Sequence, residues 1–400
     1  MVRVRVDKVV AEGDGLGRLE DGRVVFVEGA LPGELVEIEI VRQSRDYARA
    51  KVTSVIEPNA DRVEPPCPHV ARGCGGCDLQ HASVSLQRRI KRDIVVESLT
   101  RIAKFVEPEV RAVVDELPSE GWRSSLRVAV DAEGRVGFRR RRSNDVLAVD
   151  RCLVADRRLD RSFTSAFTSA FTGAFTGAPA GWGGVEEISL RVGDDDHVSA
   201  WADPTIGSAD DRIAITVDGA VLRVSSASFF QSSARGAAAL SDVVRRALGD
   251  PSGWPEGPFL DAYGGIGLFS RTVAPDDRRV ILVEANPFAV ADARANLDGR
   301  STRGRNTVFA GRFEDWTPEP VAVAVADPSR DGLRAAAVEV LRAAAPATLA
   351  LVSCDPASLG RDARLLVENG FEFEWSEVVD LFPHTHHVEV VSRFVSRDRL

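Results

Sequence analysis

The stretch Phe259–Phe269 reads FLDAYGGIGLF and decides the fold of the C-terminal half of this 400-residue chain. Its apolar start is typical of a buried strand, its glycines form a tight turn, and its apolar end begins a helix. Glycines in such a turn let the backbone approach a ligand closely. The spacing differs from G-x-G-x-x-G, because Leu268, Phe269 and Ser270 follow Gly267. The turn therefore predicts a ligand site, but not one for a dinucleotide.

Alternating strand and helix patterns surround this turn from about residue 225 to the C-terminus, which predicts an α/β fold with a parallel sheet. The next strand, residues 279–283, is followed by Glu284, 21 positions after Tyr263. An acidic side chain there can accept hydrogen bonds from a ribose diol. A glycine-rich first turn followed by such an acid is the arrangement of class I S-adenosylmethionine (SAM) methyltransferases. We therefore expect a class I SAM methyltransferase (Rossmann-like) domain.

Two further strand ends in this half carry polar side chains. Residues 321–326 form an apolar strand followed by Asp327, which either faces the ligand cleft or caps the next helix. Leu351–Pro356 reads LVSCDP, so Cys354 ends another strand. Ligands bind beyond the carboxyl ends of strands in an open α/β sheet. A lone cysteine is more often a small buried residue than a nucleophile, so the role of Cys354 depends on other motifs.

The N-terminal half divides into two segments. Residues 1–58 alternate apolar and polar side chains in short runs between Gly- and Pro-containing turns, which is typical of a small OB-like β-barrel. Residues 59–224 combine an amphipathic helix near residues 83–104 with a β-meander near residues 122–154. We therefore expect three domains: a barrel (1–58), an α+β domain (59–224) and a methyltransferase domain (225–400). A Phe-Thr repeat at residues 163–178 has no assigned role.

The middle segment carries the signature of a metal site. Three of the five cysteines, Cys67, Cys74 and Cys77, lie within eleven residues, and Cys152 is the remaining candidate ligand apart from Cys354. Four thiolates fit either structural zinc or an iron–sulfur cluster. Only one pair has the C-x₂-C spacing that zinc knuckles favour. We therefore expect a [4Fe–4S] cluster on Cys67, Cys74, Cys77 and Cys152, with zinc as the alternative.

Charge and composition limit the other classes of function. The formal net charge of −9 argues against a uniformly basic surface, but residues 123–142 carry seven arginines against two acids. This arginine stripe favours a phosphate-binding strand about as much as a merely solvated one. No apolar run is long enough to span a membrane, and the N-terminus shows no secretory core, so we expect a cytoplasmic protein.

Several motifs taken together resemble the RNA uracil-5-methyltransferase family. They are Phe229–Gln231 (FFQ), the turn at residues 261–269, Asp327-Pro328, VSCDPASLGRD at residues 352–362 and FPHTHHVE at residues 382–389. The N-terminal barrel resembles a TRAM domain, and together with the four cysteines it singles out the iron–sulfur branch, which includes 23S rRNA uridine methyltransferases. The resemblance runs nearly end to end, apart from the Phe-Thr repeat.

The resemblance implies SAM-dependent methylation of C5 of a uridine in RNA. Uracil C5 is a weak nucleophile, so the thiolate of Cys354 would add to C6 and Glu389 would later remove the C5 proton. The residues implied at the cofactor are Gln231, Tyr263, Glu284 and Asp327. We expect the strand end to raise the thiolate fraction of Cys354, and a closed pocket to raise the pKa of Glu389 towards neutrality.

Other functions stay open at this point. We expect RNA as the partner of a monomeric enzyme, with 23S rRNA favoured and tRNA as the alternative. A SAM enzyme acting on a small molecule or protein, or a non-catalytic RNA-binding module, is less favoured, because neither needs both Cys354 and Glu389. The three histidines before Glu389 also permit a zinc site, which is the weaker interpretation because no second ligand cluster lies nearby in sequence.

Overall fold

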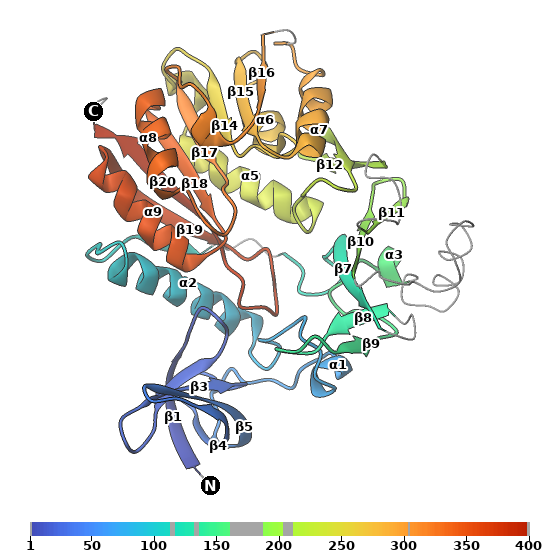
Figure 1. Cartoon of the computed structure of the whole chain (residues 1–400), viewed down its shortest axis with the longest axis vertical. Helices are drawn as coiled ribbons and strands as arrows, with labels where there is room; N and C mark the ends of the chain where they lie inside the picture. The colour runs from blue at the N-terminus through green and yellow to red at the C-terminus, as the bar shows by residue number, and fades with distance from the viewer. Residues whose placement is uncertain are drawn as a thin grey trace.

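The computed structural model describes residues 2–112, 117–131, 136–160, 187–202, 211–302 and 305–397. The Phe-Thr repeat at residues 163–178 lies outside these residues. Three parts follow one another along the chain and lie around a common centre (Figure 1). Among the described helices, none is both long and apolar enough to cross a membrane.

The first part is a closed barrel of five strands in the order β1-β2-β3-β5-β4. Its strands are β1 (Val2–Val9), β2 (Gly15–Arg18), β3 (Val24–Glu28), β4 (Leu35–Gln43) and β5 (Tyr47–Glu57). Alternating side chains such as Val25, Val27 and Val36 fill its interior, as the period-2 pattern predicts. Strand β2 lies so close to β1 that a Cβ at Gly17 would stand 2.5 Å from Val4.

The second part contains a five-stranded antiparallel sheet in the order β11-β10-β7-β8-β9. Its elements are α1 (Pro68–Ala71), β7 (Ser125–Val130), β8 (Val136–Arg139), β9 (Val146–Ala148), α3 (Arg157–Asp160), β10 (Glu187–Val192) and β11 (Val198–Trp201). The meander expected at residues 122–154 is therefore confirmed for β7, β8 and β9. Cys74 and Cys152 pack against the apolar core of this sheet.

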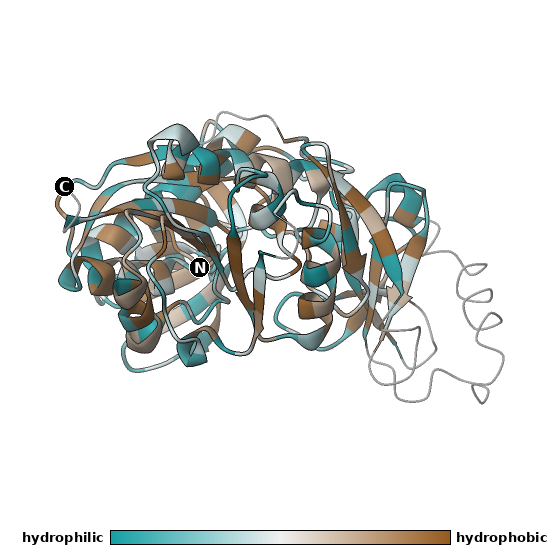
Figure 2. Ribbon diagram, turned by 90° about the horizontal axis from the view of Figure 1, so that it is seen from above, coloured by the Kyte–Doolittle hydropathy of each residue, from teal (hydrophilic) through white to brown (hydrophobic). Residues whose placement is uncertain are grey.

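The third part is an eight-stranded sheet in the order β16-β15-β14-β17-β18-β20-β19-β6. Its strands are β6 (Val110–Ala112), β14 (Phe259–Ala262), β15 (Val280–Glu284), β16 (Thr307–Ala310), β17 (Val323–Ala326), β18 (Thr348–Ser353), β19 (Phe371–Val379) and β20 (Glu389–Ser396). Strands β14 to β18 run parallel, whereas β20 runs antiparallel between β18 and β19. Figure 2 shows brown, apolar segments on strands and helices of the interior, mixed with white and teal ones.

Helices cover both faces of this sheet, and each face has its own apolar core. The helices are α2 (Val84–Arg101), α5 (Ala234–Leu248), α6 (Leu268–Thr272), α7 (Pro287–Leu297), α8 (Arg334–Ala344) and α9 (Pro356–Glu368), and a hairpin of β12 (Arg212–Val217) and β13 (Ala220–Ser225) packs beside α7. Helices α5, α6 and α7 share one core, and α2, α8 and α9 share the other. The middle segment thus contributes α2 and β6 to the third part, and the domain limits at residues 58 and 224 stay predictions.

Candidate active site

Three polar side chains meet at one edge of the large sheet because of its topology. Asp327 follows β17 and Cys354 follows β18, so both lie at carboxyl ends of parallel strands. Strand β20 is antiparallel to β18, which brings its first residue, Glu389, to the same edge. Ser353 pairs with Val390, so the next position on each strand places Cys354 beside Glu389. The structure thus brings together the two residues expected to be catalytic.

The electrostatic environment of Cys354 differs from the expectation. Burial, and then the charges of Glu389 and Asp327, raise the pKa of the Cys354 thiol to about 12, while the charge of Arg330 opposes them. The expectation that this strand end raises the thiolate fraction of Cys354 is therefore wrong for the protein without its substrate and cofactor. The physical reasons are burial, which is the largest cause, and the two nearby carboxyl groups, whose effect on the pKa outweighs that of Arg330.

The carboxyl groups themselves are strongly perturbed. Glu389 is only 4% exposed, and burial together with the charge of Asp327 raises its pKa well above the usual range. Burial raises the pKa of Asp327 to about 7. The raised pKa of Glu389 agrees with the sequence-based expectation. Two like charges in one buried place cannot both ionise readily, so the pair holds a proton near neutral pH, which suits acid–base work.

The glycine-rich turn between β14 and α6 is shaped for close approach. A Cβ at Gly264 would lie 2.6 Å from Leu282 and 2.9 Å from Asp261, so no larger residue fits there. Gly267 caps helix α6 with φ at +89°, a conformation that favours glycine. The backbone N–H of Gly265 donates to Glu284 Oε2 at 2.9 Å, which holds the turn against the end of β15.

Asp261 is a site residue that the sequence reasoning did not single out. Its carboxylate is fully buried at the start of the turn, where Oδ2 accepts hydrogen bonds from the N–H and hydroxyl of Ser270. Its Oδ1 has no partner, and burial raises its pKa to about 7. The sequence did contain a signal for Asp261, because it is an acidic residue near the end of an otherwise apolar strand that leads into a glycine-rich turn.

The remaining expected cofactor residues lie around the same edge of the sheet, but they differ in burial and in the hydrogen bonds that they already form. Gln231 is buried in the loop before α5, while its neighbour Phe229 is 73% exposed. The Tyr263 hydroxyl donates to Glu314 Oε1 at 3.1 Å, and its backbone adopts φ of +59°. Glu284 accepts from two backbone N–H groups of adjacent turns, one of them Asn286, and retains lone pairs for a ligand.

The segment at residues 380–388, which leads into Glu389, is fixed by helix α2 and by Asp78. Gln87 accepts from the backbone N–H of His384 at 2.7 Å, and Asp78 Oδ1 accepts from that of His386 at 2.8 Å. The His386 ring also bonds Asp78. In the part of the chain that the structure describes, no three His, Cys, Asp or Glu side chains are arranged to hold a metal ion, so the zinc interpretation of the histidines finds no support.

The four cysteines of the middle segment come from separate places in the chain. Cys67 is the N-cap residue of helix α1, and the backbone of Cys74 forms an isolated antiparallel β-bridge with Arg140. Cys77 lies directly before Asp78, and Cys152 lies after β9. The charges of Cys67, Cys74 and Cys152 each add to the effect of burial, which raises the pKa of Cys77 to about 12. The thiols are therefore electrostatic neighbours, although the described side chains do not form a ready metal site.

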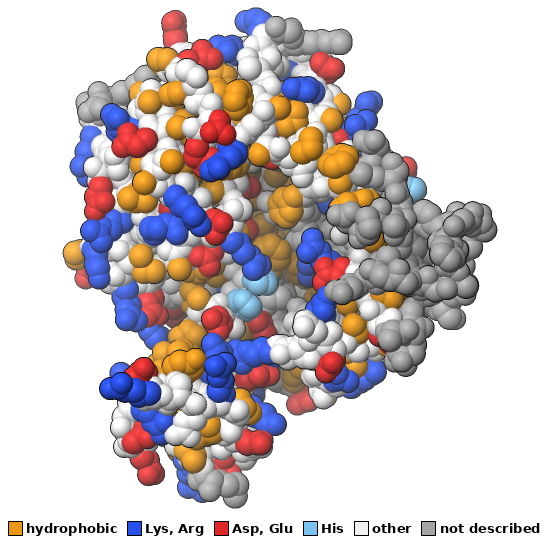
Figure 3. Space-filling model, in the orientation of Figure 1, with side chains coloured by type: hydrophobic (Ala, Val, Ile, Leu, Met, Phe, Trp, Pro, Cys, Tyr) orange, Lys and Arg blue, Asp and Glu red, His pale blue; other side chains and the backbone are white. Residues whose placement is uncertain are grey.

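Two arginines at the C-terminal end of the stripe form ion pairs with the barrel. Arg141 and Arg142 both pair with Asp14 and Glu28 of the barrel, and Asp14 is 1% exposed. Arg139 pairs with Glu187. The ion pairs of Arg141 and Arg142 join the barrel to the central sheet, whereas Arg140 is exposed, and the phosphate-binding interpretation of the stripe stays a prediction. Basic and histidine side chains nonetheless gather around the hollow where the three parts meet (Figure 3).

Comparisons with known proteins agree with this architecture. A TRAM domain matches residues 1–53. An uncharacterised RNA methyltransferase of Streptomyces avermitilis is 32% identical, over 97% of this chain and 96% of its own. The 23S rRNA (uracil(1939)-C(5))-methyltransferase RlmD of Shewanella amazonensis is 30% identical, over 98% and 95%. The tRNA (uracil-54, C5)-methyltransferase of Pyrococcus abyssi, solved with S-adenosyl-L-homocysteine, has a TM-score of 0.75 at 22% identity over 98% and 99% of the two chains, and confirms the expected fold.

Proposed function

Because the chain belongs to the RNA uracil-5-methyltransferase family, we propose that it transfers a methyl group from SAM to C5 of a uridine in RNA. The observation that carries the proposal is the meeting of Cys354, Glu389 and Asp327 at one edge of the sheet. A non-catalytic RNA-binding module has no need of a thiol beside two buried carboxyl groups. A methyltransferase acting on an ordinary nucleophile has no need of Cys354.

The glycine-rich turn fits SAM. At Gly265 a Cβ would meet nothing within 4 Å, so the turn is open there, and the unpartnered Oδ1 of the buried Asp261 offers an acceptor for a polar ligand. Glu284 is placed to accept from ribose hydroxyl groups, and Gln231, Tyr263 and Asp327 complete the proposed set. When bound there, SAM supplies an electrophilic methyl group.

The residues of the chain then act on the uracil ring in two steps. The Sγ of Cys354 adds to C6, and the electrons of the C5–C6 double bond move to C5, which takes the methyl group. The carboxylate of Glu389 removes the C5 proton, the double bond reforms, and Sγ leaves. A base in folded RNA must be unstacked to reach this edge, at a cost of a few kcal/mol. The exposed ring of Phe229, next to the buried Phe230-Gln231, offers a surface for stacking the extruded base.

Ionising the thiol is the demanding step. With a pKa of about 12, Cys354 is almost entirely protonated at neutral pH in the protein alone. Arg330 is the cation that lowers this pKa, and it forms no ion pair or hydrogen bond with any other residue that the structure describes. We assign Arg330 the role of stabilising the thiolate once the substrate excludes water from the site.

We favour 23S rRNA over tRNA as the substrate. The Shewanella relative, named for uracil 1939 of 23S rRNA, is 30% identical over nearly the whole chain, whereas the Pyrococcus protein, named for uracil 54 of tRNA, shares the fold at 22% identity. The barrel at residues 1–53 supports an RNA substrate of either kind. We also propose that the enzyme works as a monomer in the cytoplasm.

One labelling experiment tests the reaction, the mechanism and the substrate. Wild type, Cys354→Ala and Glu389→Gln proteins are incubated with methyl-labelled SAM and either 23S rRNA or tRNA transcripts. We expect wild type to label 23S rRNA, Cys354→Ala to give neither product nor adduct, and Glu389→Gln to accumulate a labelled protein–RNA adduct that survives denaturing electrophoresis. Methylation by Cys354→Ala would overturn the covalent mechanism. Label in tRNA alone would show that the substrate is tRNA and not 23S rRNA.

A second proposal concerns the cysteines. We propose that Cys67, Cys74, Cys77 and Cys152 hold a [4Fe–4S] cluster that organises the central domain. Their mutual electrostatic effect and their partly buried positions support it, because iron–sulfur clusters are bound by four thiolates shielded from solvent. Protein purified without oxygen should contain about four iron atoms per chain, and Cys152→Ser should lose them. Stoichiometric zinc without iron, or full iron in Cys152→Ser, would overturn the proposal.

A further inference from the structure

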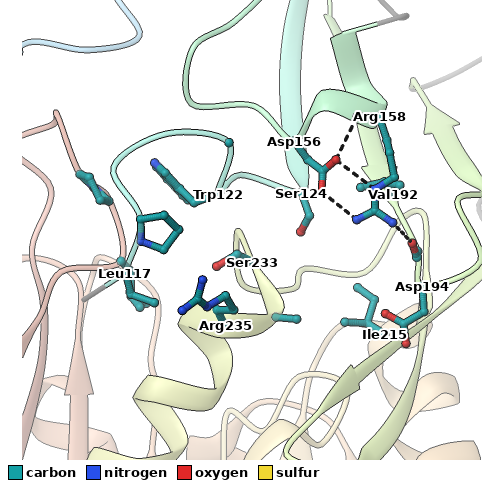
Figure 4. A pocket seen from close by; sticks show the side chains of 16 residues that line it. Leu117, Trp122, Ser124, Asp156, Arg158, Val192, Asp194, Ile215, Ser233 and Arg235 are labelled. Carbon is teal, nitrogen blue, oxygen red and sulfur yellow. Dashed lines mark hydrogen bonds and ion pairs between the residues drawn. The ribbon is translucent and has the colours of Figure 1, made fainter. Parts of the chain in front are cut away.

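A separate cavity of about 280 Å³ lies between the central sheet and the N-terminal end of helix α5. Trp122, Ser124 and Arg158 line it from the central part, and Ser233 and Arg235 line it from the methyltransferase part (Figure 4). None of Cys354, Asp327, Glu389, Tyr263 and Glu284 contributes to its wall. The cavity is therefore distinct from the catalytic edge and from the cofactor turn.

The chain nevertheless connects this cavity to both sites. Leu381 and Pro383 of its wall belong to the segment that leads into Glu389, and Ser233 lies two residues after Gln231. A ligand in the cavity would thus contact the segment before the proposed base and the loop of a proposed cofactor residue. A substrate that spans the domain junction is placed to do this.

The chemistry of the wall selects the kind of ligand. The apolar part includes Trp122, Leu117 and Leu381. Arg158 is fully engaged, since its guanidinium bonds Asp156 and the carbonyl of Gly193. Arg235 is exposed at the cavity and forms no hydrogen bond or ion pair with any residue in the described ranges.

Asp194 also lines the cavity and pairs with no cation in the described ranges, but it lies across the cavity from Arg235 (Figure 4). The apolar Trp122 wall and the unpaired guanidinium of Arg235 therefore suit a flat ring whose anionic group lies at Arg235. The volume lies just below the usual range for drug-sized ligands, so it fits one base rather than a larger cofactor. We propose that the cavity holds one nucleotide of the RNA substrate other than the target uridine, with its base against the Trp122 wall and its phosphate at Arg235. This inference rests on the proposed function for its RNA substrate, taken here as 23S rRNA.

Three variants separate the parts of this proposal. Arg235→Gln removes the charge, and Ala234→Leu fills the cavity from helix α5 without changing charge. Arg223→Gln on β13 is the matched control, because Arg223 is exposed, lies outside the cavity, and its side chain has no partner among the described residues. Val192→Phe fills the cavity from β10 and replaces Ala234→Leu if that variant does not fold.

The probe is a 23S rRNA hairpin that carries the uridine named for the Shewanella relative, with single abasic substitutions around the target. We expect Arg235→Gln to reduce the salt slope of binding by about 0.7 to 1, as for one lost phosphate contact, while Arg223→Gln leaves it unchanged. Removal of the base at one flanking position should weaken RNA binding by the wild-type protein about 5- to 100-fold. In Ala234→Leu, whose cavity is filled, removal of the same base should not change RNA binding. Affinity for S-adenosylhomocysteine should stay constant throughout.

Two results would overturn the proposal: an unchanged salt slope for Arg235→Gln, or no flanking position whose abasic effect depends on the cavity. These are binding measurements, so they are independent of turnover. A wild-type protein that binds the hairpin without methylating it would instead defeat the proposed function.

Discussion

Lys91 and Asp380 form a buried ion pair that joins helix α2 to the segment leading into Glu389. The ammonium of Lys91 lies 2.6 Å from Asp380 Oδ1 and 2.8 Å from the carbonyl oxygen of Phe382, and the side chain is completely buried. Burial lowers the pKa of Lys91, and the charge of Asp380 opposes this shift. Asp380 also pairs with Arg88 at 3.4 Å, so removal of Lys91 leaves Asp380 with this longer ion pair, whereas removal of Asp380 leaves the buried ammonium of Lys91 with the carbonyl of Phe382 alone among the contacts described here.

We predict that Lys91→Met destabilises the protein by about 1–3 kcal/mol, because the buried oxygens of Asp380 and Phe382 lose their donor and Asp380 keeps only Arg88, at 3.4 Å, as a cationic partner. Calorimetry should show a lower Tm. The remaining folded protein should lose kcat more than affinity for RNA, because the segment before Glu389 is no longer held. Lys8→Met is the matched control, since Lys8 pairs with Glu97 of the same helix in a partly exposed position. For Lys8→Met we expect the free energy of unfolding to fall by about 0–1 kcal/mol. Equal losses in both variants would refute the argument.

The burial of Lys91 shows where sequence reasoning ends. The apolar spacing at residues 83–104 predicts helix α2, but it assigns Lys91 to the polar face together with Arg88 and Arg92. The partner that makes burial tolerable is 289 positions away, and no local pattern contains that information. Helices and strands follow from short-range periodicity, whereas buried charges depend on contacts between distant segments.

The partners of the arginine stripe could not be predicted from the local sequence either. Clustering alone cannot tell a guanidinium that faces RNA from one that faces a carboxylate, and Asp14 lies more than 120 residues before Arg141 and Arg142. By contrast, the strand ends at Asp327 and Cys354 could be predicted, because parallel topology brings successive carboxyl ends to one edge. Glu389 required the family resemblance, since only an antiparallel β20 brings its first residue there.

We predict that Asp14→Ala loosens the barrel from the central sheet. Its buried carboxylate bonds Arg49 of the barrel as well as Arg141 and Arg142, so its removal leaves Arg141 and Arg142 only the longer, more exposed ion pairs with Glu28 as described ion pairs to the barrel. Limited proteolysis should cut the connection near residues 58–66 faster than in wild type. Asp7→Ala, at an exposed position of β1, should leave the rate unchanged.

A double-mutant cycle makes this prediction specific. If Asp14 acts through the two arginines, adding Asp14→Ala to Arg141→Ala/Arg142→Ala should increase proteolysis less than the sum of the separate effects. Fully additive effects would show that Asp14 stabilises the barrel in some other way.

We predict that neutralising two residues near Cys354 shifts its pKa in opposite directions. The charge of Glu389 raises this pKa and that of Arg330 lowers it, so Glu389→Gln should lower it and Arg330→Gln should raise it. Burial is the largest cause, so the thiol should stay less acidic than an ordinary cysteine in both. The rate of alkylation by iodoacetamide at Cys354, followed by peptide mass spectrometry between pH 7 and 10, measures the shift. Faster alkylation in Arg330→Gln would contradict the assignment of that residue.

The last prediction concerns Asp327 and the pH dependence of stability. Burial raises its pKa from the ordinary value of 3.8 to about 7 in the folded protein. Between these values the folded state holds a proton that the unfolded state has released, so stability falls as the pH rises through this window. Asn carries no such proton. The Tm of Asp327→Asn should therefore match wild type near pH 4, exceed it increasingly up to about pH 7, and stay higher above that, at the expense of activity. The exposed Asp331→Asn serves as the control and should follow wild type at every pH. A constant difference between Asp327→Asn and wild type from pH 4 to 8 would show that Asp327 is ionised in the folded protein throughout, and would remove it from the proposed proton-holding pair with Glu389.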